Sequence, residues 1–153
     1  HVKSNYKMNS KRIKRILLEE NKMKVGSKKT IMKFFKEINN IKFKLLKIIK
    51  EIKSKNQSIH GYGASTKGNV LLQYFGIGNN YIDYVAERNP KKYNLYTPGT
   101  KIKIISEKNS RARKPNFFLV LPWHFQKEIL KREKIIRSKG TKFIFPLPKL
   151  KIY

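Results

Sequence analysis

The 153-residue chain has no cysteine and few acidic residues, with 9 Asp and Glu against 37 Lys and Arg. Without thiolates it can form neither disulfides nor cysteine-ligated zinc sites, and this composition fits a reducing, cytoplasmic location. Its three histidines are scattered, so we expect no metal site. The sequence holds no apolar run of about 18 residues and no secretory apolar region, so we predict no membrane span.

The surplus of basic residues gives the chain a formal net charge of +28. A field this positive attracts polyanions, including nucleic acids and anionic membranes. However, the excess is mostly Lys, spread along the whole chain together with frequent Ile and Asn, which is what an AT-biased coding sequence favours. Charge alone leaves a polyanion-binding role and a coding bias equally open.

The first third of the sequence has a helical pattern. We predict a helix from a cap at Asn9 or Ser10 to about Asn21, a turn over 22–29, and a long helix over 30–53 whose apolar residues recur at three and four. The long helix is also rich in Lys, so it either lies on a membrane surface or, as we favour, packs on the following sheet or a neighbouring domain. The chain starts at His1-Val2-Lys3, a sequence typical of the inside of an element. We therefore expect 1–29 to continue from a missing upstream region and 30–153 to form one Rossmann-like domain, with its α/β core over 57–153.

From Gln57 onward, short apolar runs alternate with turn residues. The pattern predicts strands over 58–62, 81–85, 101–105, 116–121 and 142–145, helices over 66–75 and 124–138, a turn-rich loop over 93–100 and an exposed basic loop over 106–115. In the helix over 124–138 the residues expected to face inward are Phe125, Ile129, Leu130, Ile135 and Ile136. Strands that alternate with helices favour an α/β fold. We predict a Rossmann-like, mostly parallel sheet of about four to five strands with flanking helices, preceded by N-terminal helices.

Several of the least generic segments follow directly on predicted strands. The first strand runs into Gly61–Asn69, the second into Glu87-Arg88-Asn89-Pro90, and the fourth into Pro122-Trp123-His124. Ligands of open parallel sheets bind beyond the carboxyl ends of the strands. We therefore expect these three segments to converge on one ligand site.

The loop after the first strand has the chemistry of an anion site. We select Tyr62, Gly63, Ala64, Ser65, Lys67, Gly68 and Asn69 as candidate binding residues, because glycines admit close backbone approach and a helix start favours anions. The loop matches neither a Walker sequence nor a Gly-x-Gly-x-x-Gly fingerprint, since Thr66 stands at the third glycine position and Gly68 follows Lys67. A purely structural tight turn is the alternative.

The second strand ends in Glu87, 24 residues after Gly63. This is the position of a ribose-binding acid in dinucleotide-binding folds, while Arg88 is suited to pairing with a phosphate. A solvated ion pair between these two side chains is the alternative. We include Glu87, Arg88 and Asn89 among the candidate residues.

Trp123 and His124 follow the most apolar strand and complete the candidate set. Trp123 is suited to stacking on a base or a sugar, and His124 to hydrogen bonding or proton transfer. In the alternative interpretation, which we favour slightly, Trp123 packs against the core and His124 caps the next helix. His60 lies inside the first strand, so we expect it to be structural.

These segments, with others, resemble a known family. The stretches Gly61-Tyr-Gly-Ala-Ser-Thr-Lys-Gly-Asn69, Ile82-Asp-Tyr-Val85 with Arg88-Asn-Pro90, Tyr96-Thr-Pro-Gly-Thr100, Arg113-Lys-Pro115 and Leu121-Pro-Trp123 occur in an order that resembles the C-terminal domain of the sugar C-methyltransferases. The resemblance covers about residue 30 to the C-terminus. It implies an S-adenosylmethionine-dependent enzyme acting on nucleotide-linked deoxysugars, in which this domain helps to hold the sugar nucleotide.

The same resemblance implies that a zinc segment and a methyl-donor domain precede this domain. The chain has no cysteine cluster, and its glycine loop lacks the leading acid of a methyl-donor loop, since His60 stands there. We therefore expect S-adenosylmethionine on a missing domain, in the same or a partner chain, and no methylation by this chain alone. His124 stands where many relatives have Asn.

Two other functions stay open. The charge suits a basic nucleic-acid-binding module, although aromatic side chains interleaved with Lys, as base readers require, are not evident. A divergent dinucleotide-binding domain would use Glu87 to bind a ribose, although the irregular spacing of the glycines argues against this function.

Overall fold

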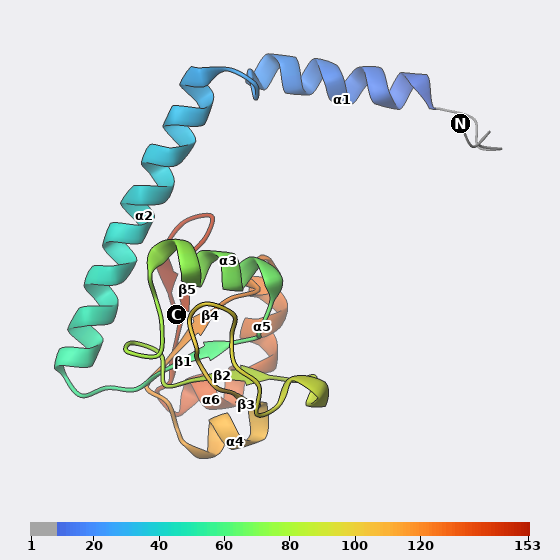
Figure 1. Ribbon diagram of the computed structural model, residues 1–153. Helices are drawn as coiled ribbons and strands as arrows, with labels where there is room; N and C mark the ends of the chain where they lie inside the picture. Colours follow the sequence, from blue (N-terminus) through green and yellow to red (C-terminus); the bar gives the residue numbers. More distant parts are fainter. Residues whose placement is uncertain (1–8) are drawn as a thin grey trace. The chain divides into compact units, whose positions relative to one another are not determined.

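A computed structural model describes residues 9–153 (Figure 1). The chain start, which we expect to continue from an upstream region, lies outside the described residues. The described chain divides into two compact units, the first ending at Asn39 and the second running from Asn40 to Tyr153. The predicted division at residue 30 stays a prediction.

The first unit contains helix α1 (Ser10–Met23) and the start of helix α2 (Lys28–Ser54). The Asn9 side chain accepts a hydrogen bond from the Arg12 N–H at 3.1 Å, which caps α1 as the sequence predicts. Lys24 ends α1 in the left-handed conformation. The apolar stripe of α1 is exposed, with 42% of Ile13 and 52% of Leu17 accessible.

The second half of α2 packs on the α/β core. Leu45, Ile49 and Ile52 are buried, and the Lys53 ammonium donates to Asp83 Oδ1 at 3.1 Å. This confirms that these positions of the long helix pack on the domain that follows it. Nearer the start of α2, Phe34 is 57% exposed. No helix in residues 9–153 combines the length and apolar character needed to cross a bilayer.

The sheet has six strands in the order β3-β2-β1-β4-β5-β6. They are β1 (Ile59–Tyr62), β2 (Tyr84–Glu87), β3 (Ile104–Ser106), β4 (Phe117–Val120), β5 (Lys142–Phe145) and β6 (Lys151–Ile152). The first five are parallel, whereas β6 pairs antiparallel with β5. The order 3-2-1-4-5 is that of doubly wound nucleotide-binding sheets, which confirms the Rossmann-like fold with one strand more than predicted.

Helices cover both faces of the sheet (Figure 1). Helix α3 (Thr66–Phe75) lies on one face, and α4 (Glu107–Ala112) and α6 (Lys134–Ser138) lie on the other. On the α4 side, an aromatic core of Tyr62, Phe118, Phe143 and Phe145 packs with Ile129 of α5 (Gln126–Arg132). Burial of these large rings supplies much of the driving force for this layer.

Three predicted segments differ in detail from the structure. The second strand begins at Tyr84 rather than Tyr81. Just before it, the Asp83 N–H donates to the Ile59 carbonyl at 2.9 Å, but the Ile59 N–H donates to the Asp83 carboxylate at 3.0 Å and not to a backbone carbonyl. The segment predicted as an exposed loop over 106–115 contains α4, because the Ser106 hydroxyl caps it by accepting from the Asn109 N–H at 3.1 Å. The third strand begins at Ile104, and a short 3-10 helix, η1 (Pro90–Lys92), follows β2.

The predicted helix over 124–138 is three segments, η2 (Trp123–Phe125), α5 and α6, with the last break at Glu133. Ile129 is buried, and Leu130 and Ile136 pack on the core as predicted. The inward placement of Phe125 and Ile135 is wrong, since these side chains are 52% and 73% exposed. Glu133 is buried instead, because it lies on the same face of the segment as Ile129 and Ile136, the face that is turned to the core.

Candidate functional site

A cleft of about 480 Å³ lies at the carboxyl ends of β1, β2, β3 and β4. Its size is that of a small-molecule site. The cleft includes the point between β1 and β4 where the strand order reverses, which is where open α/β sheets bind ligands. The lining residues are Tyr62, Gly63, Ala64, Ser65, Glu87, Arg88, Lys92, Glu107, Pro122, Phe125, Glu128, Ile129 and Arg132. The structure thus confirms that the predicted segments converge at this edge.

The glycines of the first loop serve close packing within the fold. A Cβ on Gly68 would lie 2.3 Å from Leu121 Cβ, and a Cβ on Gly61 would lie 2.9 Å from a Val85 methyl. Gly63 has φ +79°, and a Cβ there would lie 2.9 Å from Pro122 Cγ. Gly63 therefore sets the turn that brings the loop over the strand ends. The glycines need no ligand to explain them.

Glu87 holds this loop to the end of β2. Its Oε2 accepts from the Ala64 N–H at 2.8 Å, and its Oε1 accepts from the Arg88 and Asn89 N–H groups at 2.8 and 2.9 Å. Partial burial raises the pKa of this carboxyl, but the backbone hydrogen bonds and the Lys92 ammonium 3.6 Å away outweigh it, so the pKa is lowered. Glu87 is therefore an ionised clamp, and the ion pair with Arg88 considered as an alternative is not formed.

Two cationic side chains from the segment after β2, Arg88 and Lys92, line the cleft. The Lys92 ammonium donates to the Ala64 carbonyl at 2.8 Å, which ties η1 to the first loop. The exposed Arg88 side chain forms no hydrogen bond or ion pair with residues 9–153, although its carbonyl accepts from the Tyr93 hydroxyl at 3.1 Å. Arg88 is thus the lining guanidinium that is available to an anionic ligand.

The start of α3 lies beside the cleft. The Ser65 hydroxyl, at the cleft wall, accepts from the Gly68 N–H at 3.1 Å and caps the helix. Lys67, Gly68 and Asn69 do not line the cleft; Lys67 is exposed, Gly68 is buried, and the Asn69 Oδ1 is buried without a hydrogen-bond partner among the described residues. The structure places the first part of the predicted loop at the cleft and the second part behind it.

Trp123 and His124 lie beside the cleft and do not line it. Trp123 is partly buried against the aromatic core, as its packing alternative predicts. His124 is exposed, and its ring centroid lies 4.3 Å from that of Phe125. It does not cap a helix, since no side-chain cap bond is present at the start of η2 or α5. The residues that reach the cleft from this segment are Pro122 and Phe125.

A partly buried polar cluster, with Tyr62 and Glu133 as its buried members, lies at one end of the cleft. We call it the Glu133 cluster; it consists of Tyr62, Glu107, Arg111, Arg132 and Glu133. Glu133, 3% exposed, accepts from the Tyr62 hydroxyl at 2.7 Å, from Arg111 at 2.5 and 3.1 Å, and from Arg132 Nε at 3.1 Å. Glu107 accepts a hydrogen bond from Arg111 at 3.0 Å and one from Arg132 at 2.5 Å. The Arg132 side chain also contacts the Tyr62 hydroxyl.

Contacts within the Glu133 cluster shift the pKa values of its members. Burial raises the pKa of Glu133, but hydrogen bonds from Arg111 and Tyr62 prevail and lower it. Burial and the hydrogen bond to Glu133 raise the pKa of Tyr62, so its hydroxyl stays protonated. None of these residues except Tyr62 was selected from the sequence, because an Arg-Glu pair in a Lys-rich helix has the pattern of a solvated surface.

His60 is buried in β1, as expected of a structural residue. Its Nδ1 lies 2.8 Å from the Ser110 hydroxyl of α4, and its ring stacks edge-on to Tyr84. Burial is the main cause that lowers its pKa to about 4, so the ring is neutral at physiological pH. In residues 9–153, no three His, Asp or Glu side chains gather closely enough to hold a metal ion.

Comparison with known proteins gives two matches. The family described as the C-methyltransferase C-terminal domain matches residues 1–148. C-methyltransferase NovU of Streptomyces niveus is 26% identical over 137 residues, which are 90% of this chain and 33% of that protein. The chain thus spans about a third of the length of this curated relative. Since the family match covers nearly the whole sequence, the chain belongs to the C-methyltransferase C-terminal domain family.

Proposed function

We propose that the cleft at the strand ends binds a nucleotide-linked sugar for an S-adenosylmethionine-dependent C-methyltransferase. In this proposal the chain holds the substrate and has no methyl-donor site of its own. The methyl donor is bound by another domain, in the same polypeptide or in a partner chain. Membership of the C-methyltransferase C-terminal domain family supports a role in such an enzyme.

The observation that carries the proposal is the position of the cleft. It lies at the point where the strand order reverses, and Arg88 contributes a guanidinium with no partner in the described chain. Guanidinium groups bind phosphate oxygens by paired hydrogen bonds. The nearby start of α3 adds the positive end of a helix dipole. A diphosphate placed here would leave the apolar wall of Phe125 and Ile129 for the rest of the substrate.

The state of Glu87 supports the absence of a methyl-donor site. In nucleotide-binding folds the acid at the end of the second strand holds a ribose. Here both carboxylate oxygens already accept backbone N–H groups, from Ala64 on one oxygen and from Arg88 and Asn89 on the other. Because both oxygens are already occupied, Glu87 is equally unsuited to binding the ribose of a dinucleotide.

A thermal-shift panel tests the proposal. A nucleoside diphosphate at ten times its dissociation constant adds about 1.4 kcal/mol of stability, or roughly 3–6 °C for a domain of this size. We expect this shift for the diphosphate or a nucleotide sugar, and none for S-adenosylmethionine or a nicotinamide dinucleotide. Stabilisation by S-adenosylmethionine alone would refute the division of labour.

Matched variants locate the ligand. Arg88→Ala should abolish most of the shift, whereas Lys91→Ala removes an equally exposed cation that does not line the cleft and should preserve it. Equal losses in the two variants would indicate a general effect of net charge. RNA binding that persists at high salt would favour the nucleic-acid-binding alternative, because purely electrostatic binding weakens as salt is added.

A further inference from the structure

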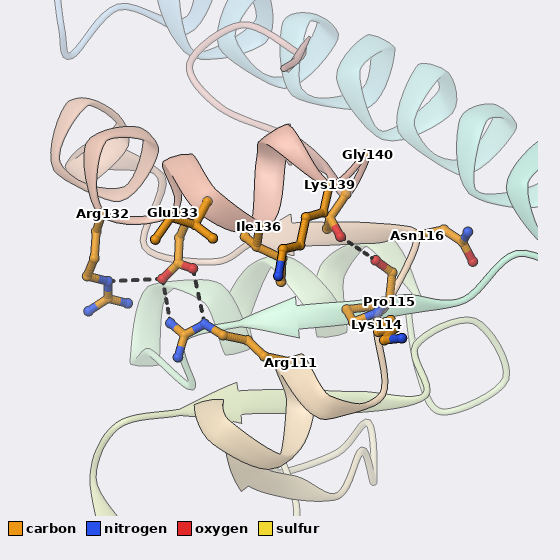
Figure 2. Close-up of a pocket in the computed structure, with 11 residues that line it drawn as sticks. Arg111, Lys114, Pro115, Asn116, Arg132, Glu133, Ile136, Lys139 and Gly140 are labelled. Carbon is orange, nitrogen blue, oxygen red and sulfur yellow. Dashed lines mark hydrogen bonds and ion pairs between the residues drawn. The ribbon is translucent and has the colours of Figure 1, made fainter.

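A second pocket, of about 660 Å³, opens at the opposite edge of the sheet (Figure 2). Its walls are the residues that precede β4 and β5, together with α6 and part of the Glu133 cluster. We call it the basic pocket; it is lined by Arg111, Lys114, Pro115, Asn116, Arg132, Glu133, Ile135, Ile136, Lys139, Gly140 and Thr141. It faces the amino ends of the strands, so the usual ligand position of this fold does not explain it.

The positive charge of the basic pocket exceeds what its carboxylate can balance. Four cationic side chains line it against the single carboxylate of Glu133. The two arginines are already paired, since Arg111 and Arg132 each bond to both Glu107 and Glu133. This leaves two ammonium groups, those of Lys114 and Lys139, which form no ion pair within residues 9–153.

The rest of the lining is suited to an organic ligand. Figure 2 shows the Lys139 side chain extending from the end of α6 toward the interior of the pocket, with the Arg111–Glu133 pairing at its floor. Ile135 is 73% exposed although it lies on the pocket wall, and Ile136 is partly buried beside it. A ligand with an apolar part would cover this exposed isoleucine and gain the free energy of removing it from water.

We propose that the basic pocket binds a phosphate monoester with an apolar part. A phosphate monoester carries about −1.5 to −2 charges at neutral pH, which matches the two unpaired ammonium groups of Lys114 and Lys139 in a single group. Lysine is a common phosphate ligand. The basic pocket and the strand-end cleft share Arg132, but Lys114 and Lys139 line the basic pocket alone, so the two proposals can fail independently.

Phenyl phosphate is a direct probe, with benzenesulfonate as a singly charged control of the same ring. A heteronuclear NMR titration of the 153-residue chain at physiological salt would report both affinity and position. We expect saturable shifts at the backbone of 114–116 and 139–141, and binding of benzenesulfonate that is roughly tenfold weaker because one charge is lost. Shifts confined to the strand-end cleft, or no saturable shift at millimolar phenyl phosphate, would overturn the proposal.

Two double variants separate the pocket from the general field of the chain. Lys114→Ala with Lys139→Ala should weaken phenyl phosphate roughly tenfold, as expected for two exposed ion pairs. Lys131→Ala with Lys134→Ala removes the same charge from exposed positions outside the pocket and should change the affinity less than about twofold. Equal weakening in the two double variants would contradict a specific site.

Discussion

Glu133 offers the sharpest test of how the core beneath the cleft is held together. In the variant Glu133→Gln the shape is kept, but the charge that Arg111 and Arg132 share is removed. One carboxylate oxygen becomes an NH₂ group that faces guanidinium or hydroxyl hydrogens, so at least one of the four hydrogen bonds to Glu133 is lost. Arg111 and Arg132 then have only Glu107 as an anionic partner.

The expected loss of stability in Glu133→Gln follows from the burial of Glu133. Removing one partner of a buried ion pair costs about 3–5 kcal/mol. Glu133 is 3% exposed, but the side chains of Arg111 and Arg132 are each 36% exposed and keep Glu107. Water therefore compensates part of the loss, and we expect the lower end, about 3 kcal/mol at pH 7.

Urea unfolding of the wild type and Glu133→Gln measures this free energy. Glu128→Gln is the control, since Glu128 is an exposed carboxylate on α5 with no ion pair in the described chain, and it should change stability by less than about 0.5 kcal/mol. A loss below about 0.5 kcal/mol in Glu133→Gln would refute the cluster as a determinant of stability.

The pH dependence gives an independent check. Since the folded-state pKa of Glu133 is lowered, its ionisation contributes stability above the unfolded value of about 4.3, and this contribution is lost as pH falls through the folded value. The difference between wild type and Glu133→Gln should therefore be constant near neutrality and shrink in acid. A difference that does not change between neutral pH and acid would contradict the charge argument.

Three further predictions concern the loop and the strands beneath it. Gly68→Ala should cost about 1–3 kcal/mol, because its Cβ would lie 2.3 Å from Leu121 Cβ, whereas Gly26→Ala meets nothing within 4 Å and should leave thermal unfolding nearly unchanged; equal melting temperatures would contradict the packing role. Glu87→Ala should speed hydrogen exchange at the three backbone amides that donate to its carboxylate. Unchanged exchange at these amides would show that Glu87 does not hold the loop. The His60 ring should titrate by NMR near pH 4, and since the unfolded ring binds its proton near 6.5, stability should rise with pH between about 4 and 6.5; a ring midpoint near 6.5 would show that burial does not control it.

Much of the fold and the place of the cleft were predictable from the sequence. Helix α3 has the predicted bounds, Thr66–Phe75, because Ser65 caps it and Gly76 ends it in the left-handed conformation. The buried strand Phe117–Val120 was recognisable as a continuous apolar run. Once the strands were taken as parallel, their ends had to meet at one edge, and the cleft lies there.

What the sequence did not reveal depends on polar groups that turn inward. Helix α4 has no apolar period, because its inward contacts are polar: Ser110 bonds to His60, and Arg111 bonds to Glu133. Its cap at Ser106, followed by Glu107 in the first turn, was a local signal that could have found it. The burial of Glu133 could not be predicted, since two of its partners, Arg111 and Tyr62, lie 22 and 71 residues away along the chain.

The position of the bound nucleotide tests the central claim most directly. A heteronuclear NMR titration of the chain with a nucleoside diphosphate should shift the backbone amides of Ala64, Ser65 and Arg88 at the strand-end cleft, and S-adenosylmethionine should not. Saturable shifts at these three amides would support a sugar-nucleotide-binding cleft. Saturable shifts at the same amides with S-adenosylmethionine, or none there with any nucleoside diphosphate at millimolar concentration, would contradict it.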